Sequence, residues 1–187
     1  MNNNIINGND IRITPLMETY ILHWGEMGTR WGVNRTVSQI HALLYLLKAP
    51  VNAEQIAAAL SVARSNVSTS IKELQSWDLI KTHSVLGDRR DHFCVKGDTW
   101  SMFLTIVEGR KKREIDPILS MLRQCELDMQ NDEETPKQVK AQISEMLTFM
   151  NTLTEWYEQI RRLPTSSLVS LMKMGTKITR FLPSKKS

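Results

Sequence analysis

Hydrophobic residues recur at helical spacing along most of the chain, which predicts a mainly α-helical fold. Thr14 followed by Pro15 is typical of a helix start, and apolar residues then recur every three or four positions to Met27. Thr36 and Gln39 form a capping-box pattern that predicts the next helix start. Residues 1–13 show no such pattern and are expected to be a mobile, asparagine-rich lead.

Residues 52–95 carry the most specific pattern. Asn52, with Gln55 three positions later, predicts a short capped helix, and residues 61–63 predict a tight turn. The following helix, residues 64–76, has one apolar stripe, and residues 79–85 and 92–95 predict a β-hairpin around Gly87 and Asp88. Two helices joined by a turn and followed by a hairpin predict a winged helix-turn-helix domain.

The second of these helices has an unusually polar outer face. Serine and threonine are mediocre helix formers, so their concentration indicates a role beyond folding. Arg64 is expected to pair with guanine and Asn66 with adenine in a major groove. The residues expected to hold phosphates are Ser65, Ser68, Thr69 and Lys72.

The predicted hairpin tip carries Asp88, Arg89, Arg90 and Asp91 in succession. These charges either pair with one another in a solvated turn or present an arginine to a narrow minor groove, where the potential is strongly negative. We favour the second interpretation, with Asp88 supporting one of the two arginines.

The C-terminal part is predicted to be helical from Asp98, and Asp116-Pro117 either kinks a helix or starts a new one. Residues 130–136 form a polar linker before a long helix with apolar residues spaced by four and three. Such a heptad seam implies a helix partner, from the same chain or a second copy. The seam consists of Val139, Ile143, Met146, Met150, Leu153, Tyr157 and Ile160.

Composition and charge narrow the class of protein. With 41% hydrophobic and 24% charged residues, the chain is typical of a soluble globular protein, and no apolar run approaches the ~20 residues that a membrane span needs. Two cysteines suit a reducing cytoplasm, the expected location. The net charge of +4 comes from a basic tail and is poor evidence for DNA binding. The tail's basic residues are Arg161, Arg162, Lys173, Lys177, Arg180, Lys185 and Lys186.

Other chemistry is weakly represented. The four histidines lack metal-ligand spacing, and neither a phosphate-binding glycine loop nor a nucleophile elbow occurs, so we expect no enzyme, metal or cofactor. Cys94 is expected to be a structural thiol. The aromatic residues either fill cores or form a cage for a quaternary ammonium ligand, and core packing is favoured. They are Tyr20, Trp24, Trp31, Tyr45, Trp100, Trp156 and Tyr157.

The chain resembles the GbsR-type branch of the MarR superfamily over residues 15–125. The stretches that carry the resemblance are SQIHALLYLL at 38–47, AEQIA at 53–57, ARSNVSTSIKEL at 63–74, GDRRDHF at 87–93 and RKKREIDP at 110–117. The resemblance implies a homodimeric winged-helix regulator that binds double-stranded DNA, usually as a repressor. Some members respond to choline, which implies a possible effector of that kind.

On this resemblance, residues 64–76 are the recognition helix and residues 87–91 the tip of the wing. The family pattern has an Asp two residues before an Arg that enters the minor groove, which Asp88 and Arg90 match. Ala63 departs from it, because many relatives have a capping serine or threonine there.

Taken together, the sequence predicts a mainly α protein with a small β-hairpin wing. Residues 1–35 are expected to form a lead and a helix at a dimer contact, 36–97 the DNA-binding domain, and 98–187 a helical dimerisation region with a basic tail. The predicted function is a sequence-specific transcriptional regulator. The alternative is a winged-helix module that binds protein, with the heptad helix as its docking surface.

Overall fold

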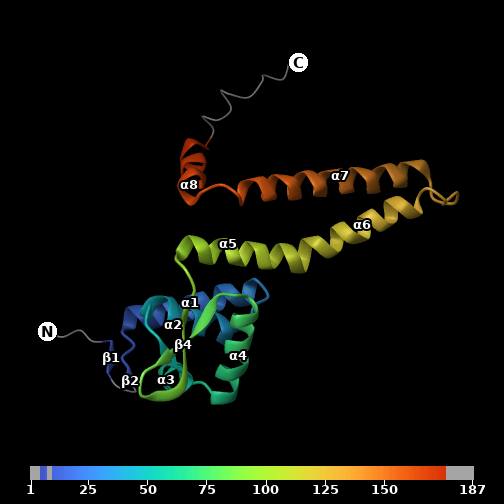
Figure 1. The fold of residues 1–187 in the computed structure, drawn as a ribbon. Helices are drawn as coiled ribbons and strands as arrows, with labels where there is room; N and C mark the ends of the chain where they lie inside the picture. Colours follow the sequence, from blue (N-terminus) through green and yellow to red (C-terminus); the bar gives the residue numbers. More distant parts are fainter. Residues whose placement is uncertain (1–4, 8–9, 176–187) are drawn as a thin grey trace. The chain divides into compact units, whose positions relative to one another are not determined.

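The computed structural model describes residues 5–7 and 10–175, most of them in helices (Figure 1). The chain divides into two units, Met1–Ile106 and Val107–Ser187. The fold is mainly α with a small antiparallel sheet, which confirms the predicted class. None of the helices in the described ranges is both long enough and apolar enough to cross a membrane.

In the first unit, the helices that precede the wing are α1 (Pro15–Arg30), α2 (Arg35–Leu47), α3 (Ala53–Leu60) and α4 (Arg64–Ser76). As predicted, Thr14 caps α1, with its hydroxyl accepting a hydrogen bond from the Met17 backbone N–H at 3.3 Å. The core centres on side chains of α2 and α3 and on the strand between them. Its fully buried members include Ile40, Leu43, Leu44, Val51 and Ile56.

The start of α2 differs from the sequence prediction. Asn34 is the cap, because its side-chain oxygen accepts the Thr36 backbone N–H at 2.8 Å. Gln39 packs against α1 at Gly25 instead of folding back on the helix start, so the expected capping box at Thr36 does not form. The asparagine ahead of the predicted box takes its place.

The N-terminal lead is partly structured, contrary to expectation. β1 (Ile6–Asn7) and β2 (Asp10–Ile11) pair as antiparallel strands. Ile6, Ile11 and Ile13 pack against the core of the first unit. Burial of these isoleucines explains why the lead forms a strand pair. Such a pair is not detected by a search for helical periodicity.

The helix-turn-helix forms as predicted. The Asn52 side chain accepts the Gln55 backbone N–H at 3.0 Å, and the Gln55 side chain accepts the Asn52 N–H at 2.8 Å, which completes a capping box. Ser61 takes a left-handed conformation (φ 52°) and turns the chain towards α4. Ala63 at the N-cap of α4 contributes no side-chain hydrogen bond, as its identity predicted.

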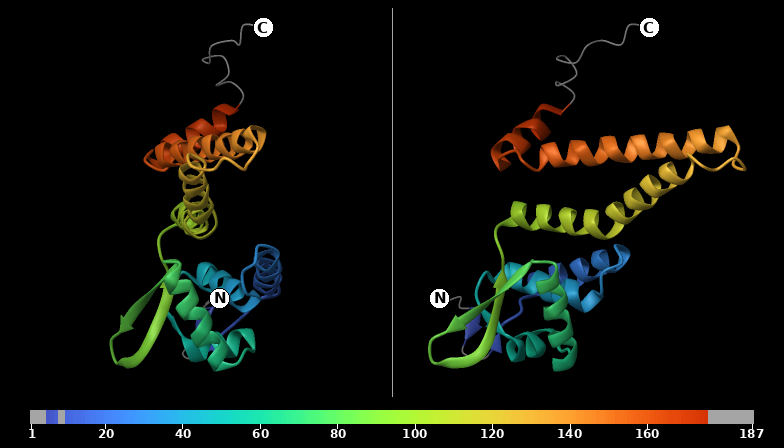
Figure 2. Two further views of the ribbon diagram at one scale, coloured as in Figure 1. Left: turned by 90° about the vertical axis from the view of Figure 1, so that its right-hand side faces the viewer. Right: turned by 45° about the vertical axis from the view of Figure 1, so that its right-hand side comes forward.

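The wing consists of β4 (Ile80–Val85) and β5 (Asp88–Val95), which extend beyond the helices of the first unit (Figure 2). The sheet order is β3-β5-β4, where β3 (Val51–Asn52) is a short strand that the sequence did not reveal. β5 starts at Asp88, four residues before the predicted strand. The tight turn at Gly87 (φ 84°) allows Asp88 to pair directly with Val85.

In the second half of the chain, α5 (Thr99–Arg110) continues through a π-helical stretch (Lys111–Ile115) into α6 (Asp116–Asp128). Pro117 lies in the first turn of α6, where proline is tolerated because the backbone N–H of a first-turn residue has no acceptor within that helix. After the linker come α7 (Lys137–Ile160) and α8 (Thr165–Met174). Lys177, Arg180, Lys185 and Lys186 of the basic tail lie outside the described residues.

α7 packs on α6 through only part of the predicted seam. Leu147 and Met150 are buried against Leu119 and Leu122, with Ile143 beside them. The seam residues Val139, Met146 and Leu153 are exposed, because α6 covers the neighbouring stripe of α7. A second apolar stripe of α7, formed by Met146, Phe149, Leu153 and Trp156, is therefore exposed in the second unit.

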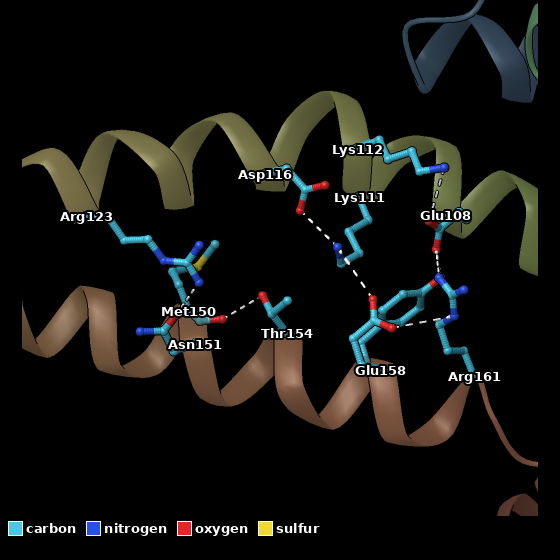
Figure 3. Close-up of polar contacts among 11 residues, drawn as sticks. Glu108, Lys111, Lys112, Asp116, Arg123, Met150, Asn151, Thr154, Glu158 and Arg161 are labelled. Carbon is cyan, nitrogen blue, oxygen red and sulfur yellow. Dashed lines mark hydrogen bonds and ion pairs between the residues drawn. The ribbon is translucent and has the colours of Figure 1, made fainter.

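Polar contacts also join α7 to α5 and α6 within the second unit (Figure 3). Glu108 accepts hydrogen bonds from the Tyr157 hydroxyl and from Arg161, both at 2.8 Å. Lys111 pairs with Asp116 at 2.9 Å and lies 3.7 Å from Glu158. Burial, together with the hydrogen bond to Glu108, raises the pKa of Tyr157 to about 12, so its hydroxyl stays protonated and donates.

Candidate nucleic-acid interface

Helix α4, the predicted recognition helix, presents one apolar and one polar face. Val67, Ile71 and Leu74 are buried in the core of the first unit, as the stripe in the sequence predicted. The opposite face, with Ser65, Thr69, Lys72 and Ser76, is exposed. Core packing therefore fixes which side of α4 meets solvent.

Four of the predicted DNA-binding residues line one hollow. Arg64, Ser68 and Lys72 lie one turn apart along α4, and Arg90 reaches the same hollow from β5. The hollow has a volume of about 300 Å³ and joins the recognition helix to the wing. It is also lined by Ala53, Glu54, Ile71, Gln75, Thr82, Asp91 and Phe93.

The other predicted contacts lie outside this hollow. Ser65 and Thr69 are exposed on the outer face of α4, where the Thr69 hydroxyl donates to the Ser65 carbonyl at 3.2 Å. Asn66 is exposed on the flank of the helix away from Arg64, as a 100° rotation per residue requires. Arg89 is exposed on the wing and is absent from the lining.

In the wing, Asp88 supports Arg90. The Asp88 carboxylate accepts hydrogen bonds from Arg90 Nε at 2.9 Å and from Arg90 Nη2 at 2.6 Å, and it also accepts the Arg90 backbone N–H at 3.0 Å. These bonds, first of all those from the guanidinium, hold the pKa of Asp88 well below its usual range. The carboxylate stays ionised and orients Arg90 at all physiological pH values.

Sequence reasoning missed Glu54 and Gln75. Glu54 Oε1 accepts a hydrogen bond from Arg64 Nε at 3.0 Å, across the turn between α3 and α4. The Gln75 side-chain amide donates to the Thr82 hydroxyl at 3.1 Å and ties α4 to β4. In the sequence, the only signal for the Glu54–Arg64 contact was that two opposite charges lie ten positions apart, one on each side of the predicted turn.

The aromatic residues lie in separate groups. Tyr20 and Trp24 stack within the first unit, with ring centroids 5.5 Å apart. Trp156 and Tyr157 line a hollow of about 310 Å³ in the second unit, together with Arg110 and Lys111. The Lys111 ammonium lies 6.0 Å from the Tyr157 ring centroid, so that aromatic face already has a cation near it.

Cys94 is half-buried in the sheet, beside a hollow of about 490 Å³ that Tyr45, Lys48, Lys81 and His83 also line. Among residues 5–7 and 10–175, no group of three or more His, Cys, Asp or Glu side chains is arranged to hold a metal ion.

Comparison with known proteins agrees with this geometry. A model of the MarR family matches residues 31–91. The HTH-type transcriptional repressor GbsR of Bacillus subtilis (strain 168) is 19% identical over 160 residues, which cover 84% of each chain. A crystal structure of a transcriptional regulator is 18% identical, with a TM-score of 0.55, and the match covers 78% of this chain and 95% of that one.

A helix-turn-helix, a polar recognition helix and an arginine-bearing wing define a winged-helix regulator of transcription that binds DNA. The family model covers the same elements, and the similarity to GbsR continues well beyond them. Residues 31–91, which hold the helix-turn-helix and most of the wing, match the MarR family of winged-helix transcriptional regulators.

Proposed function

We propose that this regulator is a dimeric repressor that reads double-stranded DNA with α4 in the major groove and the tip of the wing in the minor groove. The convergence of Arg64, Ser68, Lys72 and Arg90 on one exposed hollow supports this docking mode most directly. A winged-helix protein needs a recognition helix and a wing that reach the same duplex together.

Each side chain has a distinct role in this proposal. Arg64 pairs with a guanine and Asn66 with an adenine, while Arg90, oriented by Asp88, and Arg89 enter the minor groove. The remaining contacts are to phosphates, which fix the register without specifying sequence. The residues with that role are Ser65, Ser68, Thr69 and Lys72.

The exposed apolar stripe of α7 supports assembly into a homodimer. Met146, Phe149, Leu153 and Trp156 are between 41% and 60% exposed, which is costly for four large apolar side chains on one helix face. α1 is the other proposed contact, between the N-terminal parts. A symmetric dimer presents two recognition helices to half-sites about 34 Å apart, as a pseudo-palindromic operator requires.

Repression is the proposed sign of regulation, because the GbsR relative is named a repressor. Such a repressor carries out no catalysis, needs no cofactor and acts in the cytoplasm, where chromosomal DNA is accessible.

An effector of the quaternary ammonium type, such as choline, is the ligand to test first. In the hollow beside Trp156, the Lys111 ammonium lies 6.0 Å from the Tyr157 ring centroid and would compete with a cationic ligand, so choline is not expected to bind in that hollow.

Footprinting on the DNA upstream of the protein's own gene tests the proposal. The proposed function predicts a protected, pseudo-palindromic site with two half-sites one helical turn apart. A purified chain that protects no sequence there or elsewhere, but binds a protein partner, would favour the alternative of a protein-docking module. Adding choline during the footprint tests effector response, and release of the site would support it.

A further inference from the structure

Glu54 and Asp91 are the two acidic residues that line the proposed DNA-facing hollow, beside the cations Arg64, Lys72 and Arg90, and Glu54 is the one that contacts the recognition helix. It is the second residue of α3, and its carboxylate accepts a hydrogen bond from Arg64 Nε at 3.0 Å. That bond lowers the pKa of Glu54, and the positive charge of Arg90 adds to the shift, so the carboxylate is ionised near both arginines. Both side chains of the Glu54–Arg64 pair are about half exposed (52% and 53%). Such exposed pairs stabilise a fold very little, so the contact with Arg64 itself points to a role other than folding.

We propose that Glu54 is a positioning residue for DNA readout, which holds the Arg64 guanidinium in its base-reading direction and repels phosphates from the hollow. The inference rests on the DNA-binding face proposed above. It assigns Glu54 to sequence discrimination, and not to affinity or to fold stability.

The start of α4 leaves the Arg64 side chain dependent on Glu54 for its direction. Arg64 is the first residue of that helix, and Ala63 before it offers no side-chain hydrogen bond to the helix end. A long arginine side chain loses considerable entropy when it is held in one direction, and a carboxylate that holds it before DNA arrives reduces that cost. In the part of the chain that the structure describes, the contact uses Arg64 Nε. The two Nη groups therefore remain available for a bidentate contact with guanine.

The negative charge of Glu54 repels DNA phosphates from the hollow. Arg64, Lys72 and Arg90 in the hollow attract phosphates of any sequence, and this attraction is the basis of non-specific binding. A carboxylate among them weakens every complex that brings a phosphate close. In the operator complex, the guanine contact of the pre-oriented Arg64 offsets that repulsion. Glu54 therefore weakens non-specific binding more than specific binding.

The first test uses the full-length variant Glu54→Gln, with labelled duplexes that carry the footprinted site or a scrambled sequence. Removing the carboxylate should tighten scrambled-DNA binding by about three- to tenfold and steepen its salt slope by about one phosphate contact. Operator affinity should stay constant or fall. The ratio of operator affinity to scrambled-DNA affinity should therefore fall by at least the same three- to tenfold factor. Glu133→Gln makes the same charge change in the exposed linker after α6 and should leave the ratio unchanged.

Two further variants separate position from charge. Glu54→Asp keeps the charge but is one methylene shorter, so it should keep scrambled-DNA binding as weak as in the parent while losing operator discrimination. When the chain also carries Arg64→Ala, no guanine contact remains for Glu54 to support. Glu54→Gln should then change operator affinity and scrambled-DNA affinity by the same factor.

Several outcomes would overturn the inference while leaving the proposed function standing. In one such outcome, the parent prefers its operator and the Glu54→Gln variant has the same ratio of operator affinity to scrambled-DNA affinity. Another is a Glu54→Asp variant that matches the parent on both duplexes, because charge alone would then suffice. A parent that prefers no DNA sequence would instead contradict the proposed function itself, and with it this inference.

Discussion

At the scale of single residues, Arg64 and Lys72 share one hollow but are assigned different roles. Arg64→Ala should cost about 1–3 kcal/mol on the preferred site and relax selectivity at one base pair, because a base contact is lost. Lys72→Ala should weaken binding to all sequences similarly and flatten the salt slope, because a phosphate contact is lost. Titration of operator and scrambled duplexes at several salt concentrations measures both effects.

If both variants bound the operator as tightly as the parent, the assignment of α4 as the recognition helix would be wrong. Lys173→Ala, an exposed change on α8, removes one positive charge outside the hollow and is the matched control.

The contacts of single residues show how far sequence reasoning reached. The caps at Thr14 and Asn52 could be predicted, because each depends on residues within three positions in the chain. The Glu54–Arg64 pair could not, because it depends on how the turn at residues 61–63 brings two helices together. The sequence left open whether Asp88 holds Arg89 or Arg90, although the family pattern pairs it with Arg90, and the structure shows that it holds Arg90.

At the scale of elements, the start of α4 is a weak point in local stability. Ala63 has the extended conformation of an N-cap (φ −62°, ψ 141°) but no side-chain oxygen to accept a helix N–H. Ala63→Ser should therefore raise the free energy of unfolding by about 1 kcal/mol. Chemical denaturation measures this change.

The matched control is Ala58→Ser, the same change at an exposed position inside α3, where serine should lower stability by a few tenths of a kcal/mol. Equal effects of the two changes would show that the N-cap position of Ala63 is unimportant.

The contact between α1 and α2 gives a second prediction at this scale. A Cβ at Gly28 would lie only 2.7 Å from the Ser38 Cβ, and a short side chain cannot swing aside. Gly28→Ala should lower the free energy of unfolding by about 1–3 kcal/mol through overpacking, which outweighs the better helix propensity of alanine. Adding Ser38→Gly removes the colliding atoms, and urea denaturation of the double variant should show partial recovery.

The helices of the second unit show why some elements could be predicted only in part. The heptad spacing of α7 correctly predicted a helix with an apolar partner, but α6 packs on Leu147 and Met150 and leaves Met146 and Leu153 exposed. Periodicity identifies an apolar face, whereas the stripe that a partner covers depends on tertiary packing. β3 and the β1–β2 pair were missed for the same reason, since pairing of two-residue strands is not encoded locally.

At the scale of the whole molecule, the account requires a dimer. Sedimentation at micromolar concentration without DNA should give twice the chain mass of 21.5 kDa. Phe149→Glu introduces a charge into the exposed stripe of α7 and should shift the protein towards monomer, because an unpaired charge in an apolar interface is costly.

Thr148→Glu adds the same charge at the adjacent exposed position, outside the stripe, and should leave the dimer intact. A parent that sediments as a monomer would contradict the proposed assembly. Equal effects of the two variants would contradict the proposed role of the stripe.

The central claim is that this chain recognises a specific DNA sequence through a charged helix and wing. Binding to the footprinted operator and to a scrambled duplex, measured between about 50 and 200 mM salt, tests it most directly. The account predicts a clear preference for the operator and an affinity that falls steeply with salt on both duplexes. Equal affinity for the two duplexes, or an affinity that does not change with salt, would contradict it.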